Sequence, residues 1–352
     1  MTPSAPDPAL QAYAALDPSR VLEAIDAVGL VTDGRLLQLN SYENRVFQAH
    51  LEDGSAVVAK FYRPGRWSDA QILEEHAFAL ELAAQEVAVV PPRALLHTTA
   101  PHVTALGEPP TLARIEMTGA RYRLSVSDRR TGRAPELEQP EVLEWLGRFL
   151  GRLHAVGARR PFVHRTHWGP ARGRAAQRRI LDGGLLGAAE RQAWESVSMR
   201  ALDLVEDSFS RASSTAALRL HGDFHPGNVM WRDVAAGDRG PHVVDLDDAC
   251  NGPAVQDLWM LLSGDGTAMR GQLVHLLAGY RVFRDFDPQE LLLVEPLRTL
   301  RMIHHSAWIA ERWGDPAFPA AFPWFGTPSY WAQQTAQLRE QVEVMLDPPA
   351  LA

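Results

Sequence analysis

Residues 221–228 read His221-Gly-Asp-Phe-His-Pro-Gly-Asn228 and follow a short apolar stretch that begins at Leu218. The apolar stretch predicts a buried strand, and the proline and glycines after it predict a loop. Asp223 and Asn228 lie five residues apart on this loop. A carboxylate and an amide oxygen at such spacing suit phosphoryl transfer, in which one group orients a hydroxyl and another binds Mg²⁺. We therefore expect Asp223 to be a catalytic residue and Asn228 a metal ligand.

A second strand-like segment, Gly240-Pro-His-Val-Val244, also ends in an acidic loop, Asp245-Leu-Asp247. Functional side chains often lie on loops at strand ends. Kinases place the aspartate that binds Mg²⁺ after such a strand. Asp245 is therefore expected to bind the metal and to act with Asp223 in catalysis.

Lys60 is the only lysine among 35 basic residues, and the other 34 are arginines. An ammonium is a compact charge that fits between phosphate oxygens and a carboxylate, whereas a guanidinium is a rigid planar fork. Lys60 ends the segment Val57-Val-Ala-Lys60, which is typical of the kinase strand whose lysine holds the α- and β-phosphates of ATP. This position favours a nucleotide-binding role for Lys60.

A helix is predicted to begin at Trp67-Ser-Asp69, with Ser68 or Asp69 as its N-cap. Its carboxylates Glu74 and Glu75 follow Lys60 by about fifteen residues. Either would complete the lysine–glutamate ion pair of a kinase nucleotide site.

The segments around Lys60 predict an antiparallel sheet. Arg45–Leu51 and Ser55–Tyr62 alternate in hydrophobicity, and Glu52-Asp-Gly54 between them is a hairpin turn signal. Another strand is expected to end at Met117, before an Arg-rich polar passage. We place the boundary between two lobes there, and expect Glu116 and Met117 to contact the nucleotide.

The rest of the chain has mainly helical periodicity. An apolar stripe runs from Val142 to Leu153 and ends near Gly157, and residues 185–210 predict another helix. The aromatic segment Trp313–Phe325 is expected to pack in the core. The predicted fold is of the α+β class, a two-lobed protein-kinase-like fold with a loosely held tail (1–19), an N-lobe with an antiparallel sheet and a helix (20–117), and a mainly helical C-lobe (118–352).

Composition excludes several classes of protein. A net charge of −8 disfavours sequence-independent nucleic-acid binding. The chain has no apolar run of the roughly 18 residues needed for a membrane helix, and its beginning lacks the pattern of a signal peptide. The single cysteine, Cys250, excludes an intrachain disulfide. We expect a cytoplasmic monomer that binds neither nucleic acid nor membrane.

Two other interpretations of the acidic loops remain open. His221, Asp223 and His225 alternate like ligands of a Zn²⁺ hydrolase, but that interpretation leaves Asn228 unexplained. His221 is better explained as a structural residue packed beneath the loop. Asp245-Leu-Asp247 resembles the catalytic acids of haloacid-dehalogenase-type phosphatases, although Ala249 differs from the residue usual there. Asp257 is either an ordinary helix-start acid or a buried acid that binds backbone amides of the 221–228 loop.

The chain is similar to the bacterial stress response kinase A family, within the aminoglycoside-phosphotransferase and choline-kinase-like superfamily. The similarity covers nearly the whole chain. It is carried by the segments Leu39–Val46, Lys60–Trp67, Gln71–His76, His221–Asp223, Val244–Leu261 and Asp315–Pro319.

The resemblance implies an ATP- and Mg²⁺-dependent Ser/Thr protein kinase that phosphorylates itself and protects cells under stress. It implies that Asp223 is the proton acceptor, that Asn228 and Asp245 bind Mg²⁺, that Lys60 and Glu75 form the phosphate-binding ion pair, and that Ser41 lies over the nucleotide. The sequence departs from ordinary protein kinases because it has no Gly-rich loop, and its metal loop reads Asp-Leu-Asp instead of Asp-Phe-Gly.

Two alternatives stay open for function. Related kinases phosphorylate small molecules such as choline, homoserine and antibiotics, and a cationic acceptor would need an acidic pocket. Asp247, Asp248 and Glu295 could supply one, or could instead bind a second Mg²⁺ or pair with Arg298 and Arg301. A nucleotide-binding pseudokinase regulator is the other alternative, and the complete set of catalytic residues argues against it.

Overall fold

The computed structural model describes Tyr13 and residues 16–95, 98, 100–117, 120–212, 217–233 and 240–351. The chain folds into two compact units. The N-terminal unit contains residues 1–133 and the segment His242–Asp247, and the C-terminal unit contains Ala134–Pro241 and Asp248–Ala352. Apart from Tyr13 and residues 16–19, the predicted tail lies outside the described residues.

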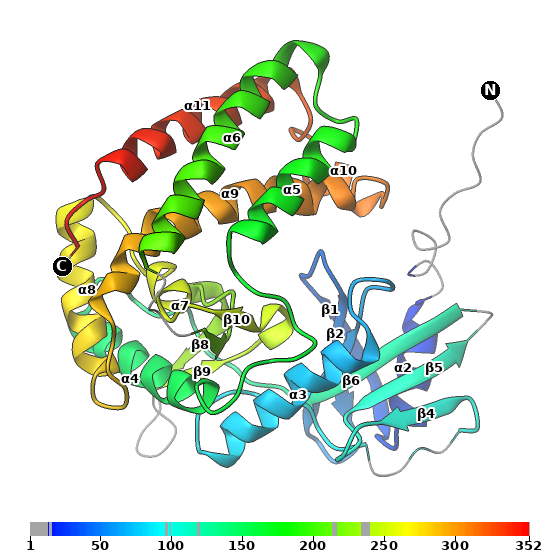
Figure 1. Cartoon of the computed structure of the whole chain (residues 1–352). Coiled ribbons are helices and arrows are strands. Elements are labelled where there is room, and N and C mark those ends of the chain that lie inside the picture. The colour runs from blue at the N-terminus through cyan, green and yellow to red at the C-terminus, as the bar shows by residue number, and fades with distance from the viewer. Residues whose placement is uncertain are drawn as a thin grey trace, which may run out of the picture. The chain divides into compact units, whose positions relative to one another are not determined.

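The N-terminal unit contains a six-stranded sheet in the order β1-β2-β3-β6-β5-β4. Every neighbouring pair in the sheet is antiparallel, as the sequence predicts. Figure 1 shows the strands together with the helices of this unit. The elements are α2 (Pro18–Ala27), β1 (Thr32–Leu39), β2 (Arg45–Leu51), β3 (Ala56–Phe61), α3 (Asp69–Ala84), β4 (Val103–Leu106), β5 (Leu112–Met117) and β6 (Ala120–Asp128).

Alternating side chains of the strands form the core of this unit. Buried and half-buried residues alternate along β3, because successive side chains of a strand point to opposite faces. Phe61 at the end of β3 meets Phe47 and Tyr122 edge-to-face, with ring centroids 6.1 and 6.2 Å apart. The predicted turn between β2 and β3 has Gly54 at φ +83°, a conformation that glycine adopts without strain. Sheet and turn confirm the predicted hairpin.

Strand β6 extends the sheet beyond the boundary that we expected near Met117. Tyr122, Leu124 and Val126 are buried, and the residues between them include arginine and serine. Polar and apolar residues alternate along a strand with one solvent-facing side, so such a strand can resemble a polar loop in the sequence. The N-terminal unit accordingly continues to Arg133.

Helix α3 begins where the sequence predicts. Ser68 is the N-cap, its Oγ accepts the N–H of Gln71, and the Gln71 side chain accepts the N–H of Ser68. This reciprocal capping box satisfies two N–H groups that a helix start otherwise leaves without partners. The buried face of α3 includes Ile72, Glu75 and Phe78.

The C-terminal unit is mainly helical. Its long helices α5, α6, α9 and α11 lie together in Figure 1. No helix of the described residues is both long and apolar enough to cross a bilayer. The elements of this half of the chain are α4 (Pro140–Gly157), α5 (Pro170–Asp182), α6 (Ala188–Arg211), β7 (Leu218–Leu220), the 3₁₀ turn η1 (Pro226–Asn228), β8 (Val229–Arg232), β9 (Gly240–Val243), η2 (Leu246–Asp248), β10 (Cys250–Gly252), α7 (Val255–Trp259), α8 (Gly266–Tyr280), η3 (Pro288–Leu293), α9 (Val294–Glu311), α10 (Ala317–Ala321) and α11 (Pro328–Leu346). The segment His242–Asp247, which runs from the end of β9 into η2, belongs to the N-terminal unit.

Glycines allow α4 and α8 to pack closely. A Cβ on Gly147 would lie 2.0 Å from the Leu276 carbonyl oxygen, and a Cβ on Gly279 would lie 2.0 Å from that of Glu144. Neither position tolerates a side chain without movement of the helices. This packing holds α4, whose C-terminal half carries His154, against the end of α8.

The aromatic segment Trp313–Phe325 is part of the core, as expected. Phe318 and Phe325 are buried. The ring of Phe318 lies 5.1 Å from Trp308, and that of Phe325 lies 5.6 Å from Trp331. Packing of several aromatic rings explains why this proline-rich stretch is ordered.

Glu290 is a buried acid in η3. Its carboxylate accepts the N–H of Val255 at the start of α7, at 2.7 Å. Burial raises the pKa of Glu290 to about 7, from 4.5. The folded protein therefore binds a proton at Glu290 between about pH 4.5 and 7 that the unfolded chain releases, so this group lowers stability as the pH rises through that range.

We expect Glu290→Gln to remove this loss. The free energy of unfolding of the variant should match that of the wild type near pH 4.5 and exceed it by on the order of 2 to 3 kcal/mol above pH 7. Urea unfolding from pH 4.5 to 8 measures the difference, with the exposed Glu340→Gln as a control for the loss of a charge. A difference that stays constant across this pH range would contradict the expectation.

Candidate active site

The predicted catalytic residues belong to both units. In the C-terminal unit, β7 ends just before His221. The loop that follows contains Asp223 and continues into the 3₁₀ turn η1, which ends at Asn228. Gly222 has φ +84°, and a Cβ there would lie 2.2 Å from the Asp248 carbonyl oxygen. The loop therefore needs glycine immediately before Asp223.

Asp257, on α7, fixes the start of this loop. Its carboxylate accepts the backbone N–H groups of His221 and Gly222, both at 2.9 Å. Asp257 is fully buried. A buried carboxylate is stable only when hydrogen bonds replace its hydration, so its position and that of the loop are set together. The prediction of a buried acid on the loop amides is confirmed.

His154 and Tyr280 extend the network around Asp257. His154 Nε2 lies 3.1 Å from Asp257 Oδ2, and His154 Nδ1 lies 3.0 Å from the Tyr280 hydroxyl. The carboxylate thus receives three N–H groups when Nε2 of His154 carries the proton. His154 on α4 and Tyr280 on α8 come from the closely packed helix pair, which connects that packing to the catalytic loop.

Asp223 lies between two cationic or polar groups. Arg301 Nη1, from α9, donates to Asp223 Oδ1 at 2.6 Å. His225 Nε2 lies 3.4 Å from Asp223 Oδ2. Burial alone would raise the pKa of Asp223, but His225 and Arg301 outweigh it and hold the pKa well below its usual range. Asp223 is therefore ionised at neutral pH and able to accept a hydrogen bond from a hydroxyl group.

Asn228 has a defined amide orientation. Its Nδ2 donates to the backbone carbonyl of Asp223 at 2.9 Å. This bond uses the nitrogen side of the amide and leaves Oδ1 on the other side as an acceptor. Oδ1 accepts no hydrogen bond from the described residues, so it is available as an oxygen ligand for a metal ion.

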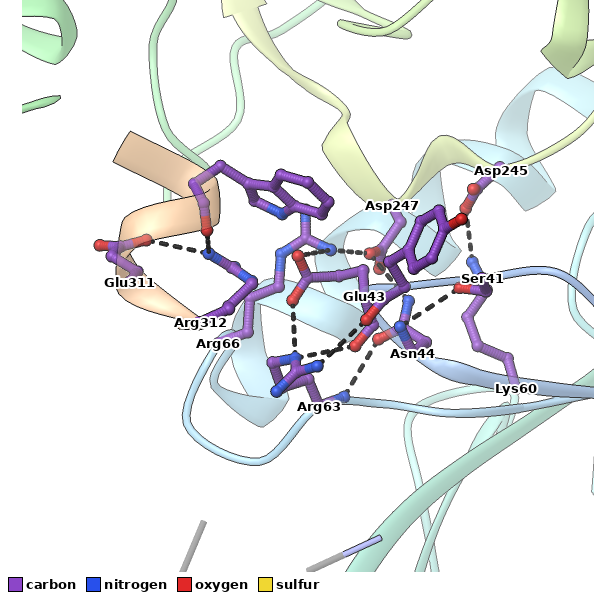
Figure 2. Close-up of polar contacts among 12 residues, drawn as sticks. Ser41, Glu43, Asn44, Lys60, Arg63, Arg66, Asp245, Asp247, Glu311 and Arg312 are labelled. Carbon is purple, nitrogen blue, oxygen red and sulfur yellow. Dashed lines mark hydrogen bonds and ion pairs between the residues drawn. The ribbon is translucent and has the colours of Figure 1, made fainter. Parts of the chain in front are cut away.

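In the N-terminal unit, Lys60 on β3 reaches Asp245. Lys60 Nζ donates to Asp245 Oδ1 at 2.7 Å, as Figure 2 shows. Burial alone would lower the pKa of Lys60, but the negative charges of Asp245, Asp247 and Glu75 outweigh it and keep the pKa well above its usual value. The ammonium group therefore stays charged.

Asp245 adopts an unusual backbone conformation. Its φ is +62°, in the left-handed region that residues other than glycine rarely occupy. Such strain is found at functional sites, where the surrounding structure enforces it. The side chain of Asp245 is 52% exposed, so one carboxylate oxygen binds Lys60 while the other is accessible to a ligand.

Asp247 has a different environment from Asp245, although they are two residues apart. It is buried, Asn44 Nδ2 donates to its Oδ2 at 3.1 Å, and Arg66 forms an ion pair with it. The first contact ties the loop at 245–247 to the segment that follows β1, and the second ties it to the segment between β3 and α3. Asp247 is thus used within the protein, which argues against the predicted acidic pocket or second Mg²⁺ at this position.

The segment Ser41–Asn44 is held by side chains instead of by a Gly-rich turn (Figure 2). Ser41 Oγ accepts the N–H of Asn44 at 3.3 Å. Arg63 donates to the carbonyl oxygens of Tyr42 and Glu43, at 3.0 and 2.9 Å. The geometry agrees with the sequence, which lacks the Gly-rich motif but places Ser41 in this loop.

Tyr13 packs against the same segment. The guanidinium carbons of Arg45 and Arg63 lie 4.5 and 5.5 Å from the centre of its ring. Its hydroxyl group donates to the Phe61 carbonyl oxygen at 3.4 Å. Sequence reasoning assigned Tyr13 to a loosely held tail, and the structure shows that it is buried.

Glu75 lies on the buried face of α3, whereas Glu74 is half-buried. Glu75 raises the pKa of Lys60 through its charge. These two facts favour Glu75 over Glu74 as the acid that acts on Lys60. The direct ion-pair partner of Lys60 in this structure is nevertheless Asp245.

Glu116 and Met117 are not brought to Lys60. Both lie at the end of β5, where Glu116 faces Arg121 of β6, with Arg121 Nε 3.2 Å from Glu116 Oε1. The residue paired with Lys60 across the sheet is Ser125 of β6, the strand that the sequence analysis missed. The contact of Glu116 and Met117 with the nucleotide stays a prediction.

The zinc interpretation finds no support in the described residues, where no group of three or more His, Cys, Asp or Glu side chains could hold a metal ion. His221 is fully buried and its Nδ1 accepts the N–H of Asp223 at 3.3 Å, which confirms its structural role. His225 Nδ1 accepts the N–H of Gly227 at 3.0 Å. Both histidines shape the loop that presents Asp223.

A family model described as the phosphotransferase enzyme family matches residues 35–293. The match spans both groups of predicted site residues, from Ser41 to Asp257. The chain belongs to this family. Its chemistry is therefore phosphoryl transfer, and the interpretation as a haloacid-dehalogenase-type phosphatase is excluded.

Sequence identity to two named relatives narrows the similarity further. The chain is 40% identical over 338 residues to serine/threonine protein kinase RdoA of Salmonella typhimurium, and the alignment covers 96% of each protein. It is 39% identical to stress response kinase A of Escherichia coli over the same share of both. The resemblance to the stress response kinase A family is thus confirmed.

Solved structures confirm the two-lobed kinase-like fold. Amicoumacin kinase hAmiN, in complex with AMP-PNP, Ca²⁺ and Ami, superposes with a TM-score of 0.68 at 17% identity over 96% of each chain. A microcompartment-associated aminopropanol kinase gives 0.66 at 17% identity, over 96% of this chain and 99% of the other. At these identities the similarity shows the α+β fold, not the acceptor.

The network around Asp257 leads to a prediction for stability. Asp257→Asn keeps the shape but replaces one of the two acceptor oxygens with an NH₂ group, so one of the three N–H groups becomes an unpaired buried donor. We expect the free energy of unfolding to fall by about 2 to 4 kcal/mol. Urea unfolding measures it, with Tyr280→Phe as a milder variant of the same network. A loss below about 0.5 kcal/mol would show that the loop does not depend on this carboxylate.

Proposed function

We propose that this phosphotransferase moves the γ-phosphoryl group of ATP to serine or threonine hydroxyls of proteins, including its own, in the cytoplasm where ATP is available. The observation that supports the chemistry is the ion pair between the only lysine and Asp245, beside a loop segment that includes Ser41. The relative named as a serine/threonine protein kinase, 40% identical over 96% of both chains, supports the acceptor.

In the proposed step, the hydroxyl oxygen of the acceptor attacks the γ-phosphorus. The bond from that phosphorus to the β,γ-bridging oxygen breaks, and ADP leaves with the electron pair. The hydroxyl proton passes to a carboxylate oxygen of Asp223. Because the pKa of Asp223 is held low, its main contribution is to orient the hydroxyl, with the proton transferred late.

Two side chains offer oxygen atoms of the kind that bind Mg²⁺. Asn228 has its amide oxygen turned away from the bond that fixes its nitrogen, and Asp245 has an accessible carboxylate oxygen. Hard cations such as Mg²⁺ prefer carboxylate and amide oxygens and usually complete their shell with water and phosphate oxygens. When bound, Mg²⁺ would neutralise charge on the phosphates. We therefore assign both residues as its protein ligands.

Lys60 would hold the α- and β-phosphates, since its ammonium group stays charged and has donors beyond the one used by Asp245. Glu75 would keep the ammonium group in place from the buried face of α3. Ser41 would contact the nucleotide from the segment that Arg63 and Tyr13 hold. These groups bind and orient the phosphates before transfer.

The decisive experiment is incubation of the purified protein with γ-labelled ATP and Mg²⁺, alone and with a generic protein acceptor. We expect label on serine or threonine, and a turnover that falls by about 10²- to 10⁴-fold in Asp223→Ala while the affinity for ATP stays unchanged. Asp223→Asn is the matched variant that keeps the shape of the side chain.

Label that persists in both Asp223 variants would contradict the assigned role. Absence of label on protein, with label on added choline or an aminoglycoside, would identify a small-molecule kinase. ATP binding without any transfer would identify a nucleotide-binding regulator.

Asp245→Asn should behave differently from the Asp223 variants. It removes both the ion pair with Lys60 and a carboxylate ligand of the metal, so we expect the affinity for Mg²⁺–ATP to fall by about tenfold or more. Titration calorimetry with ATP, with and without Mg²⁺, measures this. In the wild type Mg²⁺ should strengthen binding, and the variant should lose most of that gain. An equal response to Mg²⁺ in both proteins would argue against Asp245 as a ligand.

A further inference from the structure

Arg301 makes the acceptor side of Asp223 positively charged. It lies on α9, 78 residues after Asp223, and its Nη1 donates to Asp223 Oδ1 at 2.6 Å. Nη1 also contacts Met260 Sδ at 3.8 Å. Both contacts use the same nitrogen. The other two nitrogens, Nε and Nη2, have no hydrogen-bond acceptor among the described residues, and the side chain is 38% exposed.

The remaining edge of this guanidinium has the geometry that binds an anion. The Nε–H and Nη2–H bonds are parallel and coplanar, and such a pair binds the two oxygens of a carboxylate or phosphate at once. Because Nη1 donates to Asp223 Oδ1, this edge belongs to the same guanidinium group that contacts the carboxylate expected to orient the acceptor hydroxyl.

Two acidic residues of the C-terminal unit that could instead hold a cationic acceptor are paired with arginines. Glu295 is buried, lies 3.3 Å from Arg298 Nε, and accepts a hydrogen bond from Gln341 at 2.7 Å. Glu311 pairs with Arg179 at 2.7 Å and with Arg312 at 3.0 Å. The predicted acidic pocket is therefore not supported at Glu295, and Asp223 itself already has a cationic partner.

The surroundings of α9 carry further positive charge. Arg172 Nη2 donates to His304 Nε2 at 3.0 Å, three residues beyond Arg301 on the helix. Burial, and after it the charge of Arg172, lowers the pKa of His304 well below its usual value, while the negative charge of Asp248 acts in the opposite direction.

We propose that Arg301 selects the acceptor by binding an anionic group next to the hydroxyl that receives the phosphoryl group. In a protein acceptor, this group is an acidic side chain within one or two residues of the serine or threonine. This inference rests on the proposed protein kinase function and specifies its substrate class. The transfer step is unchanged: the serine Oγ bonds to phosphorus, ADP leaves, and the proton passes to Asp223.

The test uses three peptides that differ only in the residues on either side of a single serine, which are glutamate, glutamine or lysine. For the wild type we expect kcat/KM to be about five- to tenfold higher for the Glu-flanked peptide than for the Gln-flanked peptide. The Lys-flanked peptide should be the poorest. The ratio between two peptides cancels any general loss of activity in a variant.

Arg301→Gln should bring the ratio of the Glu-flanked to the Gln-flanked peptide close to one, and Arg301→Lys should give an intermediate ratio because it keeps the charge without the paired donors. Arg174→Gln is the matched control, since Arg174 also pairs with carboxylates, those of Asp203 and Glu206 on α6. It should keep the wild-type ratio.

A wild-type preference for glutamine or lysine, equal rates on all three peptides, or a preference that survives Arg301→Gln would overturn the inference while leaving the kinase function intact. Failure to label any peptide, together with failure to label itself or a protein acceptor, would overturn the proposed function and this inference with it. Label on itself with no label on peptides would overturn the inference alone.

Discussion

The catalytic loop depends on a carboxylate that never meets solvent. Asp257 is fully buried and accepts the N–H groups of His221 and Gly222. A carboxyl group buried at such a position is tolerated only when its hydrogen-bond partners stay in place. Any shift of the loop would leave buried hydrogen-bonding groups without partners, which costs free energy.

The contacts of this carboxylate connect it to structure on two sides. Toward the core, His154 and Tyr280 connect it to α4 and α8, which glycines bring into close contact. Toward the solvent, the chain passes from Gly222 to Asp223, and Asn228 bonds back to the Asp223 carbonyl oxygen. Asp223 and Asn228, to which we assign roles in the proposed reaction, are thus positioned by the backbone of one short loop. Precise placement of this kind is what phosphoryl transfer requires, because positioning provides most of its catalysis.

Residues marked by local patterns could be predicted, and residues that act over long sequence distances could not. Lys60, Asp223 and Asp245 each end a strand or follow one, so hydrophobicity and turn residues locate them. Arg301 contacts Asp223, which lies 78 residues earlier in the chain. No local pattern in a helix indicates that an arginine will make such a distant contact. Strand β6 was missed for another reason, since its outward face carries arginines that resemble a loop.

The roles of the arginines in this chain explain why lysine is used only at position 60. Where this chain needs a cation to hold its own backbone or carboxylates, it uses a fork with several donors: Arg63 donates to the carbonyl oxygens of Tyr42 and Glu43 at once. A planar fork that binds one protein group well has a fixed direction for its remaining donors. Lys60 faces a different demand, because its charge must act on Asp245 in this structure and on phosphates in the proposed reaction. An ammonium group on a flexible side chain can contact both groups because, unlike a guanidinium, its donors do not lie in one plane. This accounts for a lysine instead of an arginine at position 60.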